Sequence, residues 1–204
     1  MFPKLPSFRD FQPKFYSGGP MRFHLSLLYD LVSQAKPKQV VFLGFSDGDA
    51  FFTACQAALE QNIPCQCVAV RRNRAGESAD DDPAWRNGRA GGEEFYGESA
   101  RFFETPAEAL AEIADGSVEI LMLDDSDSGT RIRKDLSAWQ SKLSSSATVL
   151  IHGLRLERDD SPAAAWTASI PAPARRPAAT CASSGSRSIT RSTWPKAAPS
   201  PSAS

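Results

Sequence analysis

Two glycines in the first third of the chain have the spacing of a ligand-binding turn. Gly44 and Gly48 stand between an apolar run, 40–43, and a segment of helical periodicity. A strand, a glycine turn and a helix N-terminus in this order form a nucleotide-type pocket at the carboxyl edge of a parallel sheet. Glycine suits the turn because it adopts φ angles that side chains resist and lets a ligand approach the backbone. The spacing Gly-x-x-x-Gly differs from the Gly-x-Gly-x-x-Gly fingerprint of dinucleotide sites.

The three residues between these glycines are candidate cofactor contacts. Phe45, Ser46 and Asp47 would present backbone amides and two short polar side chains to a ligand. Serine and aspartate are also common in turns that bind nothing, because their side chains hydrogen-bond the nearby backbone. Both interpretations stay open at this point.

A histidine supplies the best candidate for a general base. His152 follows the apolar run 148–151 and is expected at the carboxyl edge of the sheet, where the pockets of such folds lie. An imidazole titrates near neutral pH, so it can take a proton from a substrate hydroxyl. The alternative is a histidine that hydrogen-bonds a loop. The other histidine, His24, lies beside the apolar face of a predicted helix and is expected to be structural.

Acidic residues gather after another apolar run. Asp124 ends the run 118–123, and Asp125 and Asp127 follow it closely. Carboxylates in a short turn could hold a hard cation. A solvated cap for the next helix is the interpretation that we favour, so no metal is expected. The four cysteines lack metal-site spacing and are expected to be reduced core residues.

Strands and helices must alternate to position these residues. Apolar periodicity predicts both kinds of element, separated by a long polar loop over 71–92. The predicted helices are 23–35, 49–61, 105–113 with Thr105 and Glu108 as a capping box, and 132–143; the predicted strands are 40–43, 65–70, 101–103, 118–123 and 148–151. This alternation indicates an α/β fold with an open, mostly parallel sheet and helices on both faces.

The predicted domain organisation has three parts. Residues 1–20 carry four prolines and are expected to form an irregular arm over the α/β domain, 21–160. Residues 161–204 are a low-complexity tail of Ala, Ser, Pro, Thr and Arg without acidic residues, expected to be disordered. A native end and a frame-shifted end are both compatible with this composition. The domain is expected to lack its C-terminal edge strands.

Composition limits the partners of the protein. The net charge of −1 gives no reason to expect nucleic acid or an anionic membrane surface. No apolar stretch approaches the length of a membrane span, and the N-terminus lacks the apolar segment of a secretory signal. The expected location is therefore the cytoplasm.

The order of these motifs resembles a class I S-adenosylmethionine-dependent methyltransferase domain. It is similar to the methyltransferase-24-like, Rossmann-like domain that occurs in bacteria near or fused to glycosyltransferases. The resemblance covers roughly residues 21–160. It rests on Val41-Phe42-Leu43-Gly44-x-x-x-Gly48, Cys67-Val68-Ala69-Val70, Asp115-Gly116-Ser117-Val118-Glu119-Ile120-Leu121-Met122-Leu123-Asp124, Arg133-Lys134-Asp135-Leu136-x-x-Trp139 and Thr148-Val149-Leu150-Ile151-His152.

The resemblance implies a cofactor site around S-adenosylmethionine. It assigns residues 44–48 to the cofactor turn, Val70 and Arg71 to the end of the second strand, and Asp124 to the pocket. The family usually has an acid at the position of Arg71, where a carboxylate accepts both ribose hydroxyls and arginine can only donate. It also has an acid where this chain has Phe42, and an aspartate where this chain has Gly153.

Two functions from different classes follow from this pattern. The first is methyl transfer from S-adenosylmethionine to a hydroxyl of a small molecule or glycan, with His152 as the base and a possible glycosyltransferase partner. The second is a methyltransferase-like module without catalysis that acts as a binding or scaffold domain, because three expected polar groups are replaced. A weaker alternative is that Arg71 and Arg72 recruit a phosphorylated ligand such as a nucleotide sugar.

Overall fold

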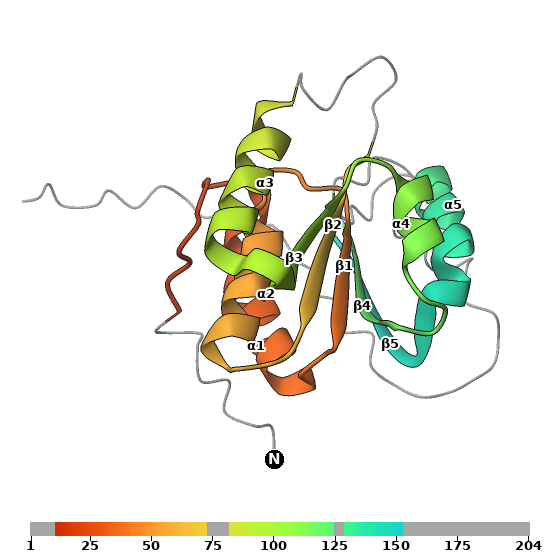
Figure 1. The fold of residues 1–204 in the computed structure, drawn as a ribbon, viewed down its shortest axis with the longest axis horizontal. Coiled ribbons are helices and arrows are strands. Elements are labelled where there is room, and N and C mark those ends of the chain that lie inside the picture. Colours follow the sequence, from red (N-terminus) through yellow and green to blue (C-terminus); the bar gives the residue numbers. More distant parts are fainter. Residues whose placement is uncertain (1–10, 73–81, 125–128, 153–204) are drawn as a thin grey trace, which may run out of the picture.

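The protein folds around one five-stranded parallel sheet. The computed structural model describes residues 11–72, 82–124 and 129–152 (Figure 1). The strand order is β3-β2-β1-β4-β5, and every neighbouring pair is parallel. The strands are β1 (Gln39–Leu43), β2 (Gln66–Val70), β3 (Ala100–Phe103), β4 (Val118–Leu123) and β5 (Leu143–Ile151). The predicted α/β fold with an open parallel sheet is confirmed.

Helices cover both faces of the sheet. Figure 1 shows α1, α2 and α3 on one face and α4 and α5 on the other. The helices are α1 (Leu25–Ala35), α2 (Asp49–Glu60), α3 (Pro83–Tyr96), α4 (Pro106–Glu112) and α5 (Gly129–Trp139), with 3-10 turns η1 (Pro20–Phe23), η3 (Gly97–Ser99) and η4 (Gln140–Lys142). None of the described helices is long and apolar enough to span a bilayer.

The connectivity creates a switch point at the centre of the sheet. The chain moves outward from β1 through β2 to β3, and then crosses back to place β4 on the other side of β1. The carboxyl ends of β1 and β4 therefore lie side by side, with Leu43 paired to Leu123. In open α/β folds, ligands bind at such a crevice.

Two apolar cores sandwich the sheet. Alternate residues of each central strand point to opposite faces, so Phe42 joins the core under α1–α3 while Val41 and Leu43 join the core under α4 and α5. All five residues from Val40 to Gly44 are buried. This is the near-continuous apolar character of a parallel strand covered on both faces.

The predicted loop over 71–92 is wrong in its second half. Pro83–Tyr96 form α3, which begins after Asp82, whose carboxylate accepts a hydrogen bond from the amide of Trp85 at 3.0 Å. Glycines obscured this helix, because glycine lowers helix propensity by about 1 kcal/mol relative to alanine. Gly88 and Gly92 are buried here, and a Cβ on either would overlap a phenylalanine ring of the core. They are present for packing.

The remaining boundaries agree with the predictions or shift by a few residues. The expected cap of α4 is present, since Thr105 Oγ1 accepts from the amide of Glu108 at 3.2 Å. Leu143 begins β5 instead of ending the preceding helix. Three cysteines, Cys55, Cys65 and Cys67, are free and buried as expected. The predicted tail, 161–204, and Asp125, Asp127, Gly153 and Cys181 lie outside the described residues.

Candidate active site

The strand ends at the carboxyl edge form a hydrogen-bonded row. The amide of Gly44 donates to the carbonyl of Val70 at 3.0 Å, and the amide of Asp124 donates to the carbonyl of Leu43 at 2.9 Å. The amide of His152 donates to the carbonyl of Leu123 at 3.0 Å. The backbones of these candidate residues are therefore fixed by the sheet itself.

His152 and Asp124 form a hydrogen-bonded pair at this edge. Nδ1 of His152 lies 3.1 Å from Oδ1 of Asp124. The side chain of Asp124 is 3% exposed and that of His152 is 20% exposed, so the imidazole is the member of the pair that solvent and ligands can reach. An ionised carboxylate can only accept, so Nδ1 carries the proton and Nε2 of the neutral ring is left as a proton acceptor.

This pair answers a question left by the sequence. Gly153 stands where the similar family has an aspartate, which removes one orienting group for His152. The structure supplies that carboxylate from the neighbouring strand, through Asp124. A partner of this kind fixes the tautomer and the orientation of a catalytic histidine.

The glycine turn has alternating backbone handedness. Gly44, Ser46 and Gly48 have φ values of 93°, 49° and 83°, whereas Phe45 and Asp47 between them have negative φ. The amide of Gly48 donates to the carbonyl of Phe45 at 2.7 Å, which closes this segment into a tight turn. Within the described part of the chain, no acceptor is assigned to the amides of residues 45–47. A positive φ at Ser46 is uncommon for a residue with a side chain.

The ring of Phe45 points away from solvent and into the core. The residue is 7% exposed, and its ring packs edge-on against Trp85 at a centroid distance of 5.4 Å. A Cβ on Gly48 would lie 2.7 Å from Cζ of Phe45, so the ring also closes over the inner side of the turn. Phe45 can thus offer a ligand its backbone, while its side chain anchors the turn to α3. Phe42 is buried in the same core, where its ring packs against Phe51.

The described part of the N-terminal arm, residues 11–19, lies against the glycine turn. The amide and hydroxyl of Ser17 donate to the two carboxylate oxygens of Asp49 at 2.7 and 2.9 Å. Asp49 is 2% exposed at the start of α2, so Ser17 satisfies a carboxylate that would otherwise be buried without these donors. Next to it, a Cβ on Gly19 would lie 1.3 Å from Oδ2 of Asp47. A side chain at this position would require the carboxylate of Asp47 to move.

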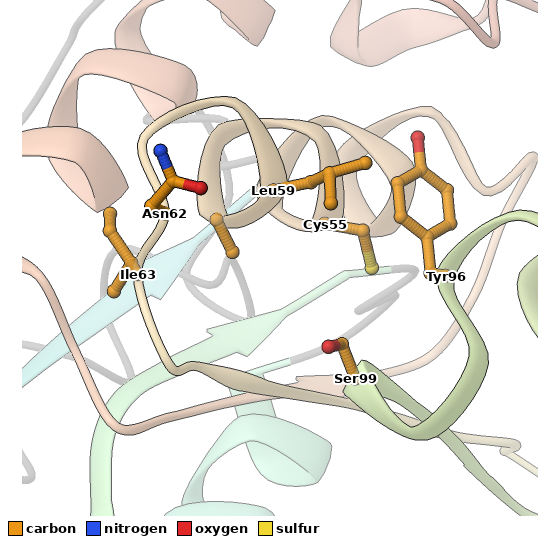
Figure 2. Close-up of a pocket in the computed structure, with 7 residues that line it drawn as sticks. Cys55, Leu59, Asn62, Ile63, Tyr96 and Ser99 are labelled. Carbon is orange, nitrogen blue, oxygen red and sulfur yellow. The ribbon is translucent and has the colours of Figure 1, made fainter.

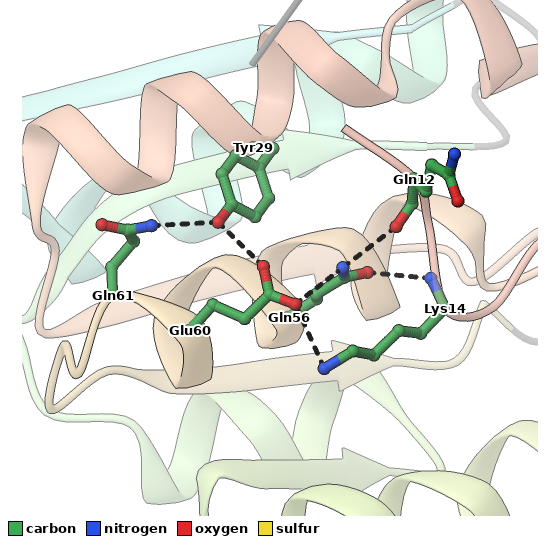
Figure 3. A network of polar contacts seen from close by, with 6 residues as sticks. All are labelled: Gln12, Lys14, Tyr29, Gln56, Glu60 and Gln61. Carbon is green, nitrogen blue, oxygen red and sulfur yellow. Dashed lines mark hydrogen bonds and ion pairs between the residues drawn. The ribbon is translucent and has the colours of Figure 1, made fainter. Parts of the chain in front are cut away.

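A polar network holds the rest of the arm on α1 and α2 (Figure 3). The side chain of Gln56 accepts from the amide of Lys14 at 2.9 Å and donates to the carbonyl of Gln12 at 3.1 Å. Glu60 lies 3.1 Å from the ammonium of Lys14 and accepts from the hydroxyl of Tyr29 at 2.9 Å. The described part of the arm therefore lies across α1 and α2.

The two arginines after β2 are paired within the protein. Nε of Arg71 lies 3.9 Å from Oδ2 of Asp82, and the side chain of Arg71 is 6% exposed. Arg72 donates to Oδ2 of Asp135 at 2.6 Å from a side chain that is 5% exposed. Burial raises the pKa of Asp135, and the guanidinium of Arg72 offsets part of that effect. A role for Arg72 in recruiting a phosphorylated ligand is therefore not favoured.

His24 lies at the same edge as His152, which the sequence alone did not indicate. The two imidazoles stand edge-on, with 6.4 Å between ring centroids and 67° between planes. His24 is half-buried, and its backbone links η1 to α1. The missing signal was tertiary: the chain has two histidines, and only the strand order brings the second beside the first helix.

A small cavity lies at the opposite edge of the sheet (Figure 2). It has a volume of about 130 Å³ and is lined by residues from the end of α2 and from the α3–β3 connection. Tyr96 and Ser99 form one wall and Cys55 another. Burial raises the pKa of Tyr96, which keeps this phenol protonated. None of the predicted site residues lines this cavity.

Comparisons with known sequences give a relative but no family. No protein-family model matches the chain. A relative, the uncharacterized protein y4gI of Sinorhizobium fredii (strain NBRC 101917 / NGR234), is 29% identical over 124 residues, which are 60% of this chain. The chain spans only 14% of the length of that relative.

Solved structures with a similar fold share little sequence with the chain. A Corynebacterium glutamicum protein solved by structural genomics has a TM-score of 0.54 at 12% identity, over 74% of this chain and 70% of that one. The SAH-bound methyltransferase PaMTH1 of Podospora anserina has a TM-score of 0.49 at 16% identity, over 64% and 52%. The protein cmcI with SAH has a TM-score of 0.43 at 16% identity, over 71% and 68%.

Proposed function

We propose that this chain is a class I S-adenosylmethionine-dependent methyltransferase domain that methylates a hydroxyl group of a small molecule or sugar. The single observation that carries the proposal is the pair of His152 and Asp124 at the strand ends, 3.1 Å apart. This pair lies at the carboxyl edge shared with the donor-lined glycine turn, where such folds bind their ligands. The sugar acceptor and a glycosyltransferase partner rest on the sequence resemblance.

The residues of the turn fit the charges of this cofactor. S-adenosylmethionine carries a carboxylate, an ammonium group and a sulfonium group. The amides of residues 45–47, which have no assigned acceptor within the described chain, can donate to the carboxylate. The carboxylate of Asp47 flanks the same turn and is half-buried, which suits a cationic neighbour. Gly44 allows the backbone to come close to the ligand.

The chain's own residues would handle the acceptor and its proton. The cofactor, when bound, would supply a methyl group from its sulfonium, and the rest of the cofactor would remain as a neutral thioether. His152 takes the hydroxyl proton at Nε2, and Asp124 stabilises the imidazolium that results. The sheet backbone fixes both residues, so the base is aligned before the acceptor arrives.

Two observations favour a second candidate, a methyltransferase-like binding module without catalysis. Arg71, not an acid, follows β2, and its carboxylate partner Asp82 already caps α3. The ring of Phe45 fills the inner side of the glycine turn. Both features reduce the number of acceptors and the space that an adenosine group would use.

Calorimetry with S-adenosylmethionine separates the two candidates. We expect micromolar binding that is lost in Gly44→Val, because valine does not tolerate a φ of 93° and blocks the approach to the turn. Gly116→Val is the matched control: Gly116 also has a positive φ, of 71°, but lies in an open turn before β4, at the opposite edge. No heat at millimolar cofactor would contradict the enzyme and support the binding module.

A further inference from the structure

Both histidines of the chain lie at one edge of the sheet, although they come from opposite ends of the described fold. The sequence contains only these two. His152 follows the last strand, and His24 precedes the first helix, yet their rings are 6.4 Å apart between centroids. The two rings are in contact but are not hydrogen-bonded to each other. Nδ1 of His152 is bonded to Asp124 instead.

The backbone of His24 is rigidly placed. Its amide donates to the carbonyl of Met21 at 2.8 Å, and its carbonyl accepts from the amide of Leu28 at 3.0 Å. Leu25 and Leu28 are 2% and 3% exposed, so the first turn of α1 is fixed in the core. Its side chain makes no capping hydrogen bond to α1. The imidazole is thus not used to begin the helix.

The separation of the rings suits one bridging oxygen atom. Centroids 6.4 Å apart in an edge-on arrangement exclude a direct hydrogen bond between the rings. A single oxygen atom between rings at this separation can hydrogen-bond to both of them. An acceptor hydroxyl in that place would have His152 on one side and His24 on the other.

We propose that His24 is an acceptor-binding residue, which holds the reacting hydroxyl oxygen opposite His152. This inference rests on the proposed function and deepens it, because it selects the chemical class of the acceptor. A hydroxyl donates its proton to Nε2 of His152, accepts an N–H of His24 with one lone pair and keeps the second lone pair for the methyl group. An amine nitrogen has a single lone pair, which His24 would occupy. The site is therefore built for oxygen.

The test uses imidazole nitrogen spectra of the ¹⁵N-labelled full chain with phenol as a hydroxyl probe. We expect phenol to shift the ring nitrogens of both histidines, and toluene, which lacks the hydroxyl, to shift neither. In His24→Asn we expect phenol to bind about threefold to tenfold more weakly, the loss of one hydrogen bond. Asparagine is favoured at this first position of a helix, so the variant should keep α1 folded.

A matched control is Gln34→Ala, at the exposed far end of the same helix, which should leave the phenol affinity unchanged. If phenol shifts one histidine or none, or if His24→Asn binds it as tightly as the parent, the proposal is wrong. These outcomes are separate from the cofactor titration. Cofactor binding with unresponsive histidines would overturn the role of His24 alone, whereas bridged histidines without cofactor binding would overturn methyl transfer and keep the oxygen site.

Discussion

At some positions of this protein, tertiary contacts determine the residue type more than helix propensity does. Gly88 lies inside α3, where alanine would favour the helix by about 1 kcal/mol. A Cβ at that position, however, would lie 2.3 Å from Cζ of Phe45, the residue that anchors the glycine turn. The helix therefore gives up propensity so that an aromatic ring from the turn can pack on its backbone.

We expect Gly88→Ala to lower the free energy of unfolding by about 1 to 3 kcal/mol, the usual cost of overpacking a core. Gly91→Ala, one turn further on, should raise it by up to about 1 kcal/mol, because helix propensity improves. A Cβ on Gly91 meets nothing closer than 3.8 Å. Urea denaturation of the two variants measures both effects. Equal responses would show that Phe45 does not pack on α3 as described.

At the scale of elements, the arm and α2 act as one unit. The arm gives Ser17 to the buried Asp49 at the start of α2, and its polar network reaches Gln56 and Glu60 near the other end. A segment that irregular composition alone would leave loose is thereby held along the whole helix. Each contact stabilises the fold by only about 1 kcal/mol, so the position of the arm on α2 depends on several of them together.

We expect Ser17→Ala to destabilise the protein by about 1 to 2 kcal/mol, because the buried carboxylate of Asp49 loses its hydroxyl donor. Ser33→Ala is the matched control: it removes a hydroxyl that only bonds the carbonyl of Tyr29 within α1. That change should stay within about 0.5 kcal/mol. Thermal unfolding of both variants checks the expectation, which would fail if the two changes cost the same.

The same network predicts a pH dependence. Burial raises the pKa of Glu60, but hydrogen bonds from Lys14, Tyr29 and Gln56 lower it by more than burial raises it. The net pKa therefore lies below its ordinary value. A carboxyl with a lowered folded-state pKa contributes stability at neutral pH, and this contribution is lost as the pH falls through that value. Glu60→Gln should therefore melt below the parent at pH 7 and close to it at pH 3. A constant difference in Tm across this range would contradict the expectation.

Sequence reasoning recovered the elements that local rules control. The strand from Val118 to Leu123 and the cap at Thr105 were predicted correctly, because both depend on residues within one short segment. Helix α3 was missed, because its buried stripe includes Gly88 and Gly92, which do not count as apolar in a periodicity search. The pairing of His152 with Asp124 and the approach of His24 also escaped, since they depend on strand order.

At the scale of the whole molecule, the described residues leave one long, uncharged edge on the sheet. Strand β5 runs from Leu143 to Ile151 with no charged residue, proline or glycine, and in the described chain only β4 pairs with it. Natural proteins usually protect such edges with charges, prolines or bulges, because free backbone groups pair with other chains. A register shift opposite Val118 and Ile120 interrupts β5 near its start, but no charge or proline follows in its regular part, 148–151. The edge is therefore a predicted site of association between copies of the protein.

We expect Ser146→Lys to lower the tendency to aggregate, because Ser146 is exposed on β5 and a lysine there opposes edge-to-edge pairing. Gln34→Lys, on the exposed end of α1, adds the same charge away from the edge and should have no comparable effect. Light scattering over a range of protein concentrations compares the variants. An equal reduction by both lysines would indicate a net-charge effect and not an open edge.

The row of strand ends also determines how fast individual protons leave the site. The amides of Gly44 and Asp124 are tied to neighbouring strands, so deuterium should replace their protons only when the sheet opens. The amides of Phe45, Ser46 and Asp47 have no such tie in the described chain and should exchange within the fastest class. A molecule seated on the turn would slow these three alone, so deuterium uptake can detect occupancy before any acceptor is known.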